Sequence, residues 1–231
     1  MFDIYYLVLV LPAVIFAMWA SSKVNSTYKK YEKVYNSRGM SGAQAARLVL
    51  DQNGLTDIKI EKISGNLTDH FDPKSKVIRL SEGVYESTST AAVGIACHEV
   101  GHAIQHAEGY APIKIRTAII PITNIGSKLA VPLIILGLIL TGMSEMFFNL
   151  VYVGIACFSL STLFQLVTLP TEFNASNRAI QSIEANGILY GEEVEGTKKV
   201  LTAAALTYVA ALAVSLMQLL RLVLMFSRRR D

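Results

Sequence analysis

The sequence has little that would stabilise a disulfide-bonded fold or bind nucleic acid. Only two cysteines, Cys97 and Cys157, occur among the 231 residues, so no disulfide framework can form. The net charge is only +3, and no basic patch interleaved with aromatic residues predicts a nucleic-acid surface. Charged residues make up 17% of the chain, whereas 52% of the residues are hydrophobic. Much of the chain is therefore expected to avoid water, and no nucleic-acid partner is expected.

Charge is scarcest in four runs that are long enough to span a lipid bilayer. The first run contains Asp3 as its one charge, and it lacks both a basic n-region and an A-x-A-like site before Ser21. These features predict a retained anchor and not a cleaved signal peptide. The predicted organisation is a transmembrane anchor (1–20), a membrane-proximal α+β part (21–117), two transmembrane helices (118–169), a second polar part (170–199), and a last transmembrane helix with a basic tail (200–231).

The first polar part contains the sequence His98-Glu99-Val100-Gly101-His102. It lies in an alanine-rich, proline-free run that follows Ser89 and stops at Gly109, which predicts a capped α-helix. Residues four apart share one helix face, so His98 and His102 can bind one Zn²⁺ while Glu99 stands beside the attacking water. Zinc lowers the pKa of its water to about 7 and polarises the carbonyl, and a glutamate takes the proton. The motif therefore predicts zinc-dependent peptide hydrolysis, whereas the alternative is an amphipathic helix without a metal.

A third zinc ligand is expected in the second polar part, on the same side of the membrane as the first, because an even number of spans separates the two parts. Pro170 and Thr171 suit the start of a helix, and after them Glu172 and Ser176 fall on one face. Hydrolases of the thermolysin type bind zinc through two histidines and one glutamate. Glu172 could be that glutamate, and Ser176 could orient a ligand histidine by a hydrogen bond. The alternative for Glu172 is a glutamate favoured by the helix dipole.

A small sheet is expected before the metal helix. Ser41 and Gln44 have the spacing of a capping box that begins a short helix. Three strand-like pieces follow at 57–63, 66–71 and 76–80, which predicts an α+β arrangement. An exposed edge strand could pair with an extended peptide, and the piece Val77-Ile78-Arg79 is the expected edge. The alternative is a plain structural hairpin.

Several segments in order resemble the YugP-type neutral zinc metallopeptidases, which are small bacterial membrane proteins. These segments are NLTDHFDP with IRLSEGVYE, HEVGHAIQH and LPTEFNASNRA. More distantly, the arrangement is similar to HtpX-like and CAAX-prenyl membrane proteases. The resemblance implies that His98, His102 and Glu172 are the zinc ligands and that Glu99 is the general base. The membrane proteases tend to carry an aspartate where this chain has Ser176.

A cationic or hydrogen-bonding side chain could assist zinc by stabilising negative charge on the substrate. Arg178, six residues after Glu172, is the preferred choice, and His70 and Tyr190 are the alternatives. His106 is expected to line the cleft, but a fourth protein ligand would occupy the site of the water.

The sequence thus predicts a mostly α-helical multipass membrane protein with a small zincin-like α+β domain at the membrane surface. Its predicted function is that of a gluzincin-like zinc endopeptidase acting on peptides or membrane proteins, with an adaptor protein or a second copy of the chain as a hypothetical partner. The predicted location is the bacterial plasma membrane, with the site facing the cytoplasm, because five basic residues follow the first span. The tail Arg228-Arg229-Arg230 argues for the opposite orientation.

Two other functions agree with part of this pattern. One is a non-catalytic membrane scaffold that holds zinc for structure. A structural zinc site has no need of a carboxylate such as Glu99 beside its first histidine, and it usually closes with four protein ligands. The other is a transporter with an intramembrane zinc site, which the scarcity of ionisable residues in the apolar runs disfavours.

Overall fold

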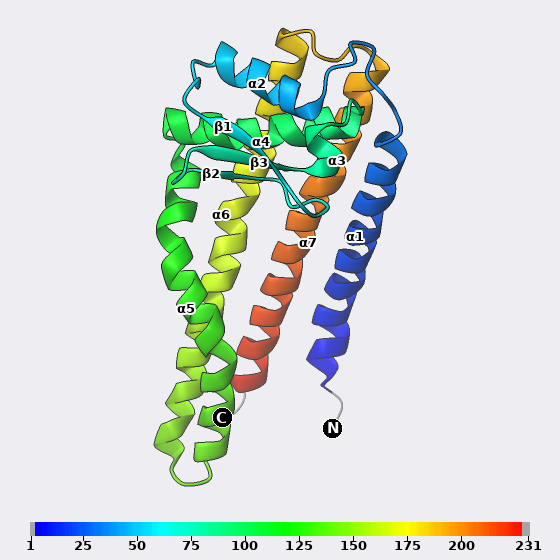
Figure 1. Cartoon of the computed structure of the whole chain (residues 1–231). Coiled ribbons are helices and arrows are strands. Elements are labelled where there is room, and N and C mark those ends of the chain that lie inside the picture. The colour runs from blue at the N-terminus through cyan, green and yellow to red at the C-terminus, as the bar shows by residue number, and fades with distance from the viewer. Residues whose placement is uncertain (1–2, 228–231) are drawn as a thin grey trace. The chain divides into compact units, whose positions relative to one another are not determined.

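The computed structural model describes residues 3–227 and is mostly helical, as predicted. Within this described range, four helices are long and apolar enough to cross a membrane, in agreement with the four apolar runs. Five of the shorter elements, together with the capped helix that carries the two histidines, belong to the polar parts (Figure 1). The helices are α1 (Leu11–Tyr31), α2 (Gly42–Gln52), α3 (Glu82–Tyr85), α4 (Thr90–Glu108), α5 (Ala111–Leu140), α6 (Asn149–Ala185) and α7 (Glu192–Ser227), with a π-helical turn η1 (Tyr6–Val10) before α1 and a 3₁₀ turn η2 (Glu145–Phe148) before α6.

The chain forms two compact units, and the long helices contribute to both. The first unit comprises the described residues of 1–20, 114–169 and 207–231, which form the apolar parts of α1, α5, α6 and α7. The second unit comprises residues 21–113 and 170–206, with the sheet, α2, α3, α4 and the polar parts of the long helices.

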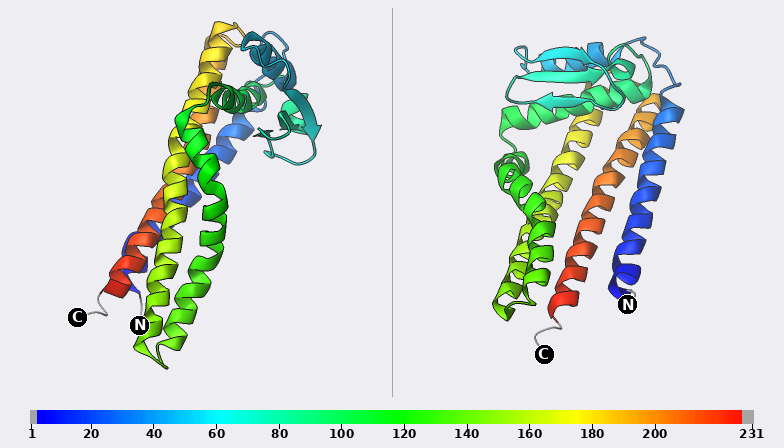
Figure 2. Two further views of the ribbon diagram at one scale, coloured as in Figure 1. Left: turned by 90° about the vertical axis from the view of Figure 1, so that its left-hand side faces the viewer. Right: turned by 60° about the horizontal axis from the view of Figure 1, so that its bottom comes forward.

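In the first unit, α5 and α6 form an antiparallel pair joined by a short turn (Figure 2). Two glycines permit close packing. A Cβ added to Gly154 on α6 would lie 2.8 Å from the Ala130 carbonyl oxygen, and one added to Gly137 on α5 would lie 2.8 Å from a Val151 methyl. Small residues at such positions let membrane helices approach until their backbones touch. Gly137 and Gly154 do not belong to a G-x-x-x-G face in the sequence. Each of them instead lets its own helix approach the other helix of the pair closely.

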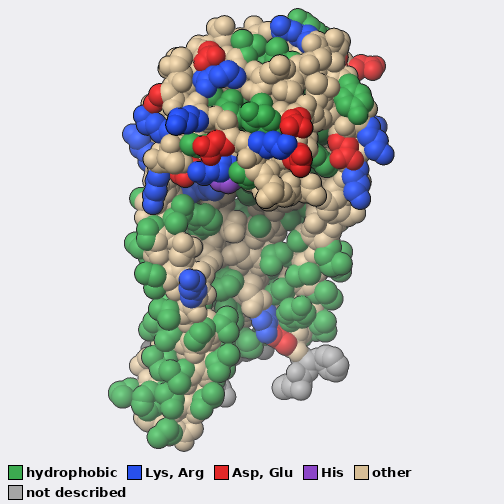
Figure 3. Space-filling view, viewed as in Figure 1, with side chains coloured by type: hydrophobic (Ala, Val, Ile, Leu, Met, Phe, Trp, Pro, Cys, Tyr) green, Lys and Arg blue, Asp and Glu red, His purple; other side chains and the backbone are tan. Residues whose placement is uncertain are grey.

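The first unit also contains one ion pair between distant parts of the chain. Arg221 near the end of α7 donates through Nε to the Asp3 carboxylate at 2.6 Å, and its guanidinium lies over the Tyr6 ring. The two charges that interrupt the first and last apolar runs thus neutralise each other, which makes their presence in apolar helices less costly. The exposed side chains of this unit are otherwise largely hydrophobic, as its visible face in Figure 3 shows.

In the second unit, α4 begins and ends as its sequence predicts. Ser89 accepts a hydrogen bond from the Ala92 backbone N–H at the N-terminus, and Gly109 adopts the left-handed conformation at the C-terminus with φ 65°. Gly109 can occupy this region because it has no Cβ. The α4 side chains Cys97, Val100 and Ala103 join the core, and burial raises the pKa of the Cys97 thiol to about 12. Cys97 is thus a core residue, as predicted.

The sheet contains the three predicted strands, but in an order that the sequence analysis did not anticipate. The strands are β1 (Lys59–Ile63), β2 (His70–Asp72) and β3 (Val77–Ser81), in the order β1-β3-β2. β3 pairs parallel with β1 and antiparallel with β2. The prediction that Val77-Ile78-Arg79 forms an edge is therefore wrong. Val77, Ile78 and Leu80 are buried, which suits a central strand, whereas β2 lies at an edge of the sheet and against α4 (Figure 1).

The predicted helix start at Pro170 is also wrong. α6 continues through this residue from the apolar run into the second unit. Proline inside a helix removes one backbone hydrogen bond, but neighbouring helices and local adjustments make this tolerable in membrane-length helices. One continuous helix thus carries Glu172 and Ser176 at fixed spacing.

Candidate active site

Two helices of the second unit bring three potential metal ligands together. His98 and His102 lie one turn apart on α4, and Glu172 lies on α6. The Glu172 Oε2 atom is 3.3 Å from His98 Nε2 and 3.5 Å from His102 Nε2. One ligand atom from each residue lies within 4.8 Å of the other two. Glu172 is buried and both histidines are partly buried, so the three atoms face a shielded site.

A close crossing of α4 and α6 makes these distances possible. Gly101 lies between the two histidines on α4, and a Cβ added to it would be 2.5 Å from the Ala175 carbonyl oxygen on α6. That distance is shorter than real Cβ contacts, and the obstacle is backbone, which cannot rotate away as a flexible side chain can. Ala175 is fully buried at this crossing. The glycine of the motif is therefore the residue that lets the two helices meet.

Both histidine rings are held through the nitrogen that faces away from Glu172. His98 Nδ1 lies 3.1 Å from Ser176 Oγ, and His102 Nδ1 lies 3.0 Å from Gln105 Oε1. Such contacts fix the ring orientation and leave Nε2 to bind a metal. Ser176 is the residue that was predicted to contact a histidine from α6.

Gln105 was missed by the sequence analysis, although it lies three residues after His102 on the same helix. Its side chain is fully buried, and its amide nitrogen donates to the Thr171 carbonyl oxygen at 2.8 Å and to Asn174 Oδ1 at 2.9 Å. One amide therefore orients a histidine on α4 and holds α6 next to the position of Glu172. A polar residue within a turn of a candidate ligand histidine is the signal that could have identified Gln105.

The charges of the cluster depend on one another. Burial alone would raise the pKa of Glu172, but hydrogen bonds and charge interactions with His102 and His98 hold it well below its usual range. Burial alone would lower the pKa of His102, yet the contacts with Glu172, the charge of Glu99 and the Gln105 hydrogen bond together raise it. Glu172 thus stays ionised, and in the metal-free protein a proton is favoured on His102.

Glu99 lies on α4 with the two histidines, but its side chain is held by strand β2. Its Oε2 accepts the Phe71 backbone N–H of β2 at 3.0 Å, and its side chain is largely buried. Because Phe71 donates to Glu99 and not to β3, its backbone groups face the edge of β2 that is not paired with β3. The carboxylate of the motif therefore lies at this edge, where it already accepts the Phe71 N–H.

The remaining predicted residues lie around this cluster with partners of their own. Arg178 contacts Glu108 at 2.7 Å and donates to Asn174 Oδ1 at 2.7 Å, so it reaches His102 only through Asn174 and Gln105. His70 is an exposed residue of β2 whose Nδ1 lies 2.8 Å from the Thr68 carbonyl oxygen.

Tyr190 follows α6 in the chain and is more than half exposed. His106 packs its ring edge against Phe71 and lines a cavity of about 300 Å³ between β2 and α4.

The donor set fits zinc. Two imidazole nitrogens and one carboxylate oxygen form the ligand set of thermolysin-type catalytic sites, which leave a position for water. Both Nε2 atoms are oriented toward Glu172 by the contacts on the opposite ring nitrogens. Cys97, the one thiol on α4, is buried in the core and does not add a fourth ligand.

Comparison with known proteins identifies the family to which the chain belongs. Residues 6–227 match the family described as "Putative neutral zinc metallopeptidase". The chain therefore belongs to this family of zinc metallopeptidases, and its cofactor is Zn²⁺. It is 48% identical over 226 residues to the "Putative membrane protease YugP" of Bacillus subtilis (strain 168), covering 98% of each chain. No solved structure matches the chain.

The close crossing predicts that Gly101→Ala disrupts metal binding. The new methyl group must push α4 away from α6, which costs about 1–3 kcal/mol of folding free energy and moves Glu172 away from the histidines. We expect zinc affinity to fall roughly tenfold or more, as measured by competition with a chromophoric chelator. Gly83→Ala is the matched control, since its Cβ would meet nothing closer than 3.6 Å. Unchanged affinity in Gly101→Ala would contradict the importance of the crossing.

Zinc affinity is also expected to depend on pH. Zinc binds neutral imidazole, but the pKa of His102 is raised in the metal-free protein, so each bound zinc must displace a proton. Affinity should fall as the pH drops through that raised pKa, by about tenfold per pH unit for one proton. Chelator competition at several pH values measures the slope, with Glu192→Gln as a control. Glu172→Gln should move the fall to lower pH, and a flat profile in the unmodified protein would refute the coupling.

Proposed function

We propose that the protein is a multipass membrane zinc endopeptidase of the gluzincin type. The observation that carries the proposal is the cluster of His98, His102 and Glu172 beside the carboxylate of Glu99. A structural zinc site closes with four protein ligands and needs no adjacent base, whereas this cluster offers three ligands and one base. The family membership supports the same conclusion.

In the proposed mechanism, His98 and His102 offer Nε2 and Glu172 offers Oε2 to the metal. When bound, zinc supplies Lewis acidity that polarises a carbonyl and favours deprotonation of a water. Glu99 accepts a proton from the attacking water and passes it to the leaving amine. The Phe71 N–H holds the Glu99 carboxylate in place, and Ser176 and Gln105 keep the histidine rings oriented.

The substrate is proposed to be an extended peptide segment that pairs with β2. Phe71 lies next to Glu99 at the edge of this strand that is not paired with β3, and because its N–H already donates to Glu99, its carbonyl oxygen is the group offered to a substrate N–H. Main-chain pairing at a strand edge binds peptides with little dependence on their side chains. This arrangement, a strand edge beside a metal helix, also underlies our proposal that the second unit is zincin-like. Peptides and membrane proteins are both suitable substrates on this basis.

Arg178 is proposed to stabilise negative charge that develops on the substrate's carbonyl oxygen. Its guanidinium is close to the α4 C-terminus through Glu108 and is linked to His102 through Asn174 and Gln105. The role requires Arg178 to exchange the exposed Glu108 for substrate. Such a pair between partly exposed groups contributes little to stability and can be replaced at small cost.

The function is tested with purified protein in detergent, using casein cleavage and zinc content as readouts. We expect Glu99→Gln to keep stoichiometric zinc and to lower cleavage roughly 10²–10⁴-fold, because only the base is lost. Glu172→Ala should lose zinc and cleavage together, whereas Glu192→Ala, an exposed glutamate outside the cluster, should keep both. Cleavage by Glu99→Gln at the level of the unmodified protein would refute the mechanism. Zinc binding without any cleavage would favour the non-catalytic scaffold.

We also propose that the site faces the cytoplasm of a bacterial plasma membrane. The support is the group of basic residues that follows the first span, since such residues stay in the cytoplasm. The exposed Asn66 lies in the first polar part, before α5 in the chain, and the exposed Met143 lies just after α5, so cysteines introduced at these positions should lie on opposite sides if α5 spans the membrane. A membrane-impermeant maleimide should label Met143→Cys but not Asn66→Cys in intact cells, and both after lysis. The reverse pattern would invert the orientation.

A further inference from the structure

A second cavity in the same unit contains no residue of the metal cluster. It has a volume of about 620 Å³ and lies between α1 and α7, well within the usual size of ligand pockets. On each helix the lining residues recur every three or four positions, so each helix contributes one face. The lining residues are Lys23, Ser26, Thr27, Lys30 and Tyr31 from α1, and Glu195, Lys198, Lys199, Thr202, Ala203 and Leu206 from α7.

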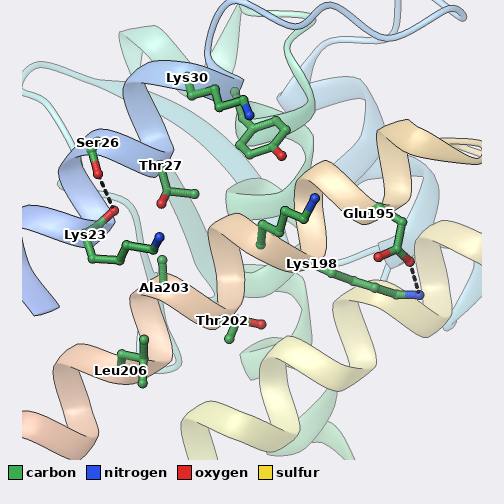
Figure 4. A pocket seen from close by; sticks show the side chains of 11 residues that line it. Lys23, Ser26, Thr27, Lys30, Glu195, Lys198, Thr202, Ala203 and Leu206 are labelled. Carbon is green, nitrogen blue, oxygen red and sulfur yellow. Dashed lines mark hydrogen bonds and ion pairs between the residues drawn. The ribbon is translucent and has the colours of Figure 1, made fainter.

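The cavity is strongly basic, with four lysines and a single carboxylate. That carboxylate is already engaged, because Lys198 pairs with Glu195 at 3.2 Å and with Glu184 at 3.1 Å. Figure 4 shows Lys198 turned toward Glu195, whereas Lys23 extends from α1 toward Thr27 and Ala203. Within residues 3–227, neither Lys23 nor Lys199 has an ion-pair partner, and both are exposed. The cavity therefore presents uncompensated positive charge.

Hydroxyl groups accompany these lysines. Thr27 and Thr202 line the cavity from opposite helices, and in the described part of the chain neither side chain makes a hydrogen bond. Lysine ammonium groups and hydroxyls together are the usual donors to phosphate oxygens, with lysine acting as a point charge. A phosphate group is thus the anion that this lining matches.

The position of the cavity along both helices indicates the source of the phosphate. On α7, Lys198 and Lys199 come directly before the last apolar run, and Ala203 and Leu206 of that run line the cavity. On α1, Lys23 follows the first apolar run, one turn after the half-exposed Trp19. Tryptophan and lysine at the end of an apolar helix are typical of the membrane interface. The cavity therefore lies where two apolar runs end, and its lining combines lysines with the apolar Ala203 and Leu206, as a site for a phospholipid headgroup at the membrane interface would.

We propose that this cavity binds the phosphate headgroup of an anionic phospholipid. Basic pockets between membrane helices bind such headgroups through charge, and an anionic lipid is preferred because Lys23, Lys30 and Lys199 have no ion pair with any residue of 3–227. The site is separate from the proposed peptidase chemistry, so it stands or falls independently of that function. A soluble phosphate compound would share the headgroup chemistry but would not need the apolar residues Ala203 and Leu206 or the neighbouring apolar runs.

The single tryptophan, Trp19, supplies the test because it is one turn from Lys23. Full-length protein is reconstituted in phosphatidylcholine vesicles doped with brominated-acyl phosphatidylglycerol or brominated-acyl phosphatidylcholine, and quenching of Trp19 fluorescence is measured. We expect preferential quenching by phosphatidylglycerol. Lys23→Gln with Lys199→Gln should lower this preference roughly tenfold. The matched control, Lys29→Gln with Lys33→Gln, removes equal charge outside the cavity and should keep it.

Zinc content of each variant verifies that it is folded, since none of these lysines contacts the metal cluster. Equal quenching by both lipids in the unmodified protein would overturn the proposal, as would an equal loss of preference in both double variants. Inorganic phosphate is added in parallel with sodium chloride at matched ionic strength. If phosphate abolishes the preference and chloride does not, the cavity is a site for soluble phosphate and the lipid assignment is wrong.

Discussion

The backbone contact between α4 and α6 is the constraint on which the candidate site depends. Gly101 and Ala175 meet without a side chain between them, and this brings a glutamate to within 3.5 Å of two histidines some seventy positions earlier in the chain. The buried amide of Gln105 bridges the same two helices and orients one of those histidines. Packing and polar contacts thus fix one geometry together, so that metal binding and the correct crossing of the helices reinforce each other.

Much of this arrangement follows from patterns that act locally along the chain. The capped α4 is predictable because Ser89 and Gly109 act within one turn of the helix that they bound. The membrane-length helices are predictable because apolar runs of sufficient length have few alternatives to a helix. Glu172 was identified because it shares a helix face with Ser176 and because a thermolysin-type zinc site needs a glutamate in addition to two histidines. Family resemblance then placed this glutamate in the same role.

The parts that could not be predicted depend on relations between distant segments. Strand alternation predicted three strands, but it contains no information about which strand lies at the centre, so β3 was wrongly expected at an edge. Pro170 suggested a helix start because proline is common there, yet the helix passes through it. The role of Gly101 cannot be predicted from the sequence, because it depends on how close the α6 backbone lies to this position of α4.

The two residues that hold the histidine rings, Ser176 and Gln105, have a consequence for the charge balance of the site. Neither side chain ionises, so both rings are contacted through Nδ1 by groups whose own charge does not change with pH. Carboxylates in the same positions would add negative charge. With a serine and an amide, the proposed ligand Glu172 and the proposed base Glu99 together balance a bound dication. The filled site would then be electroneutral, which lowers the cost of burying it.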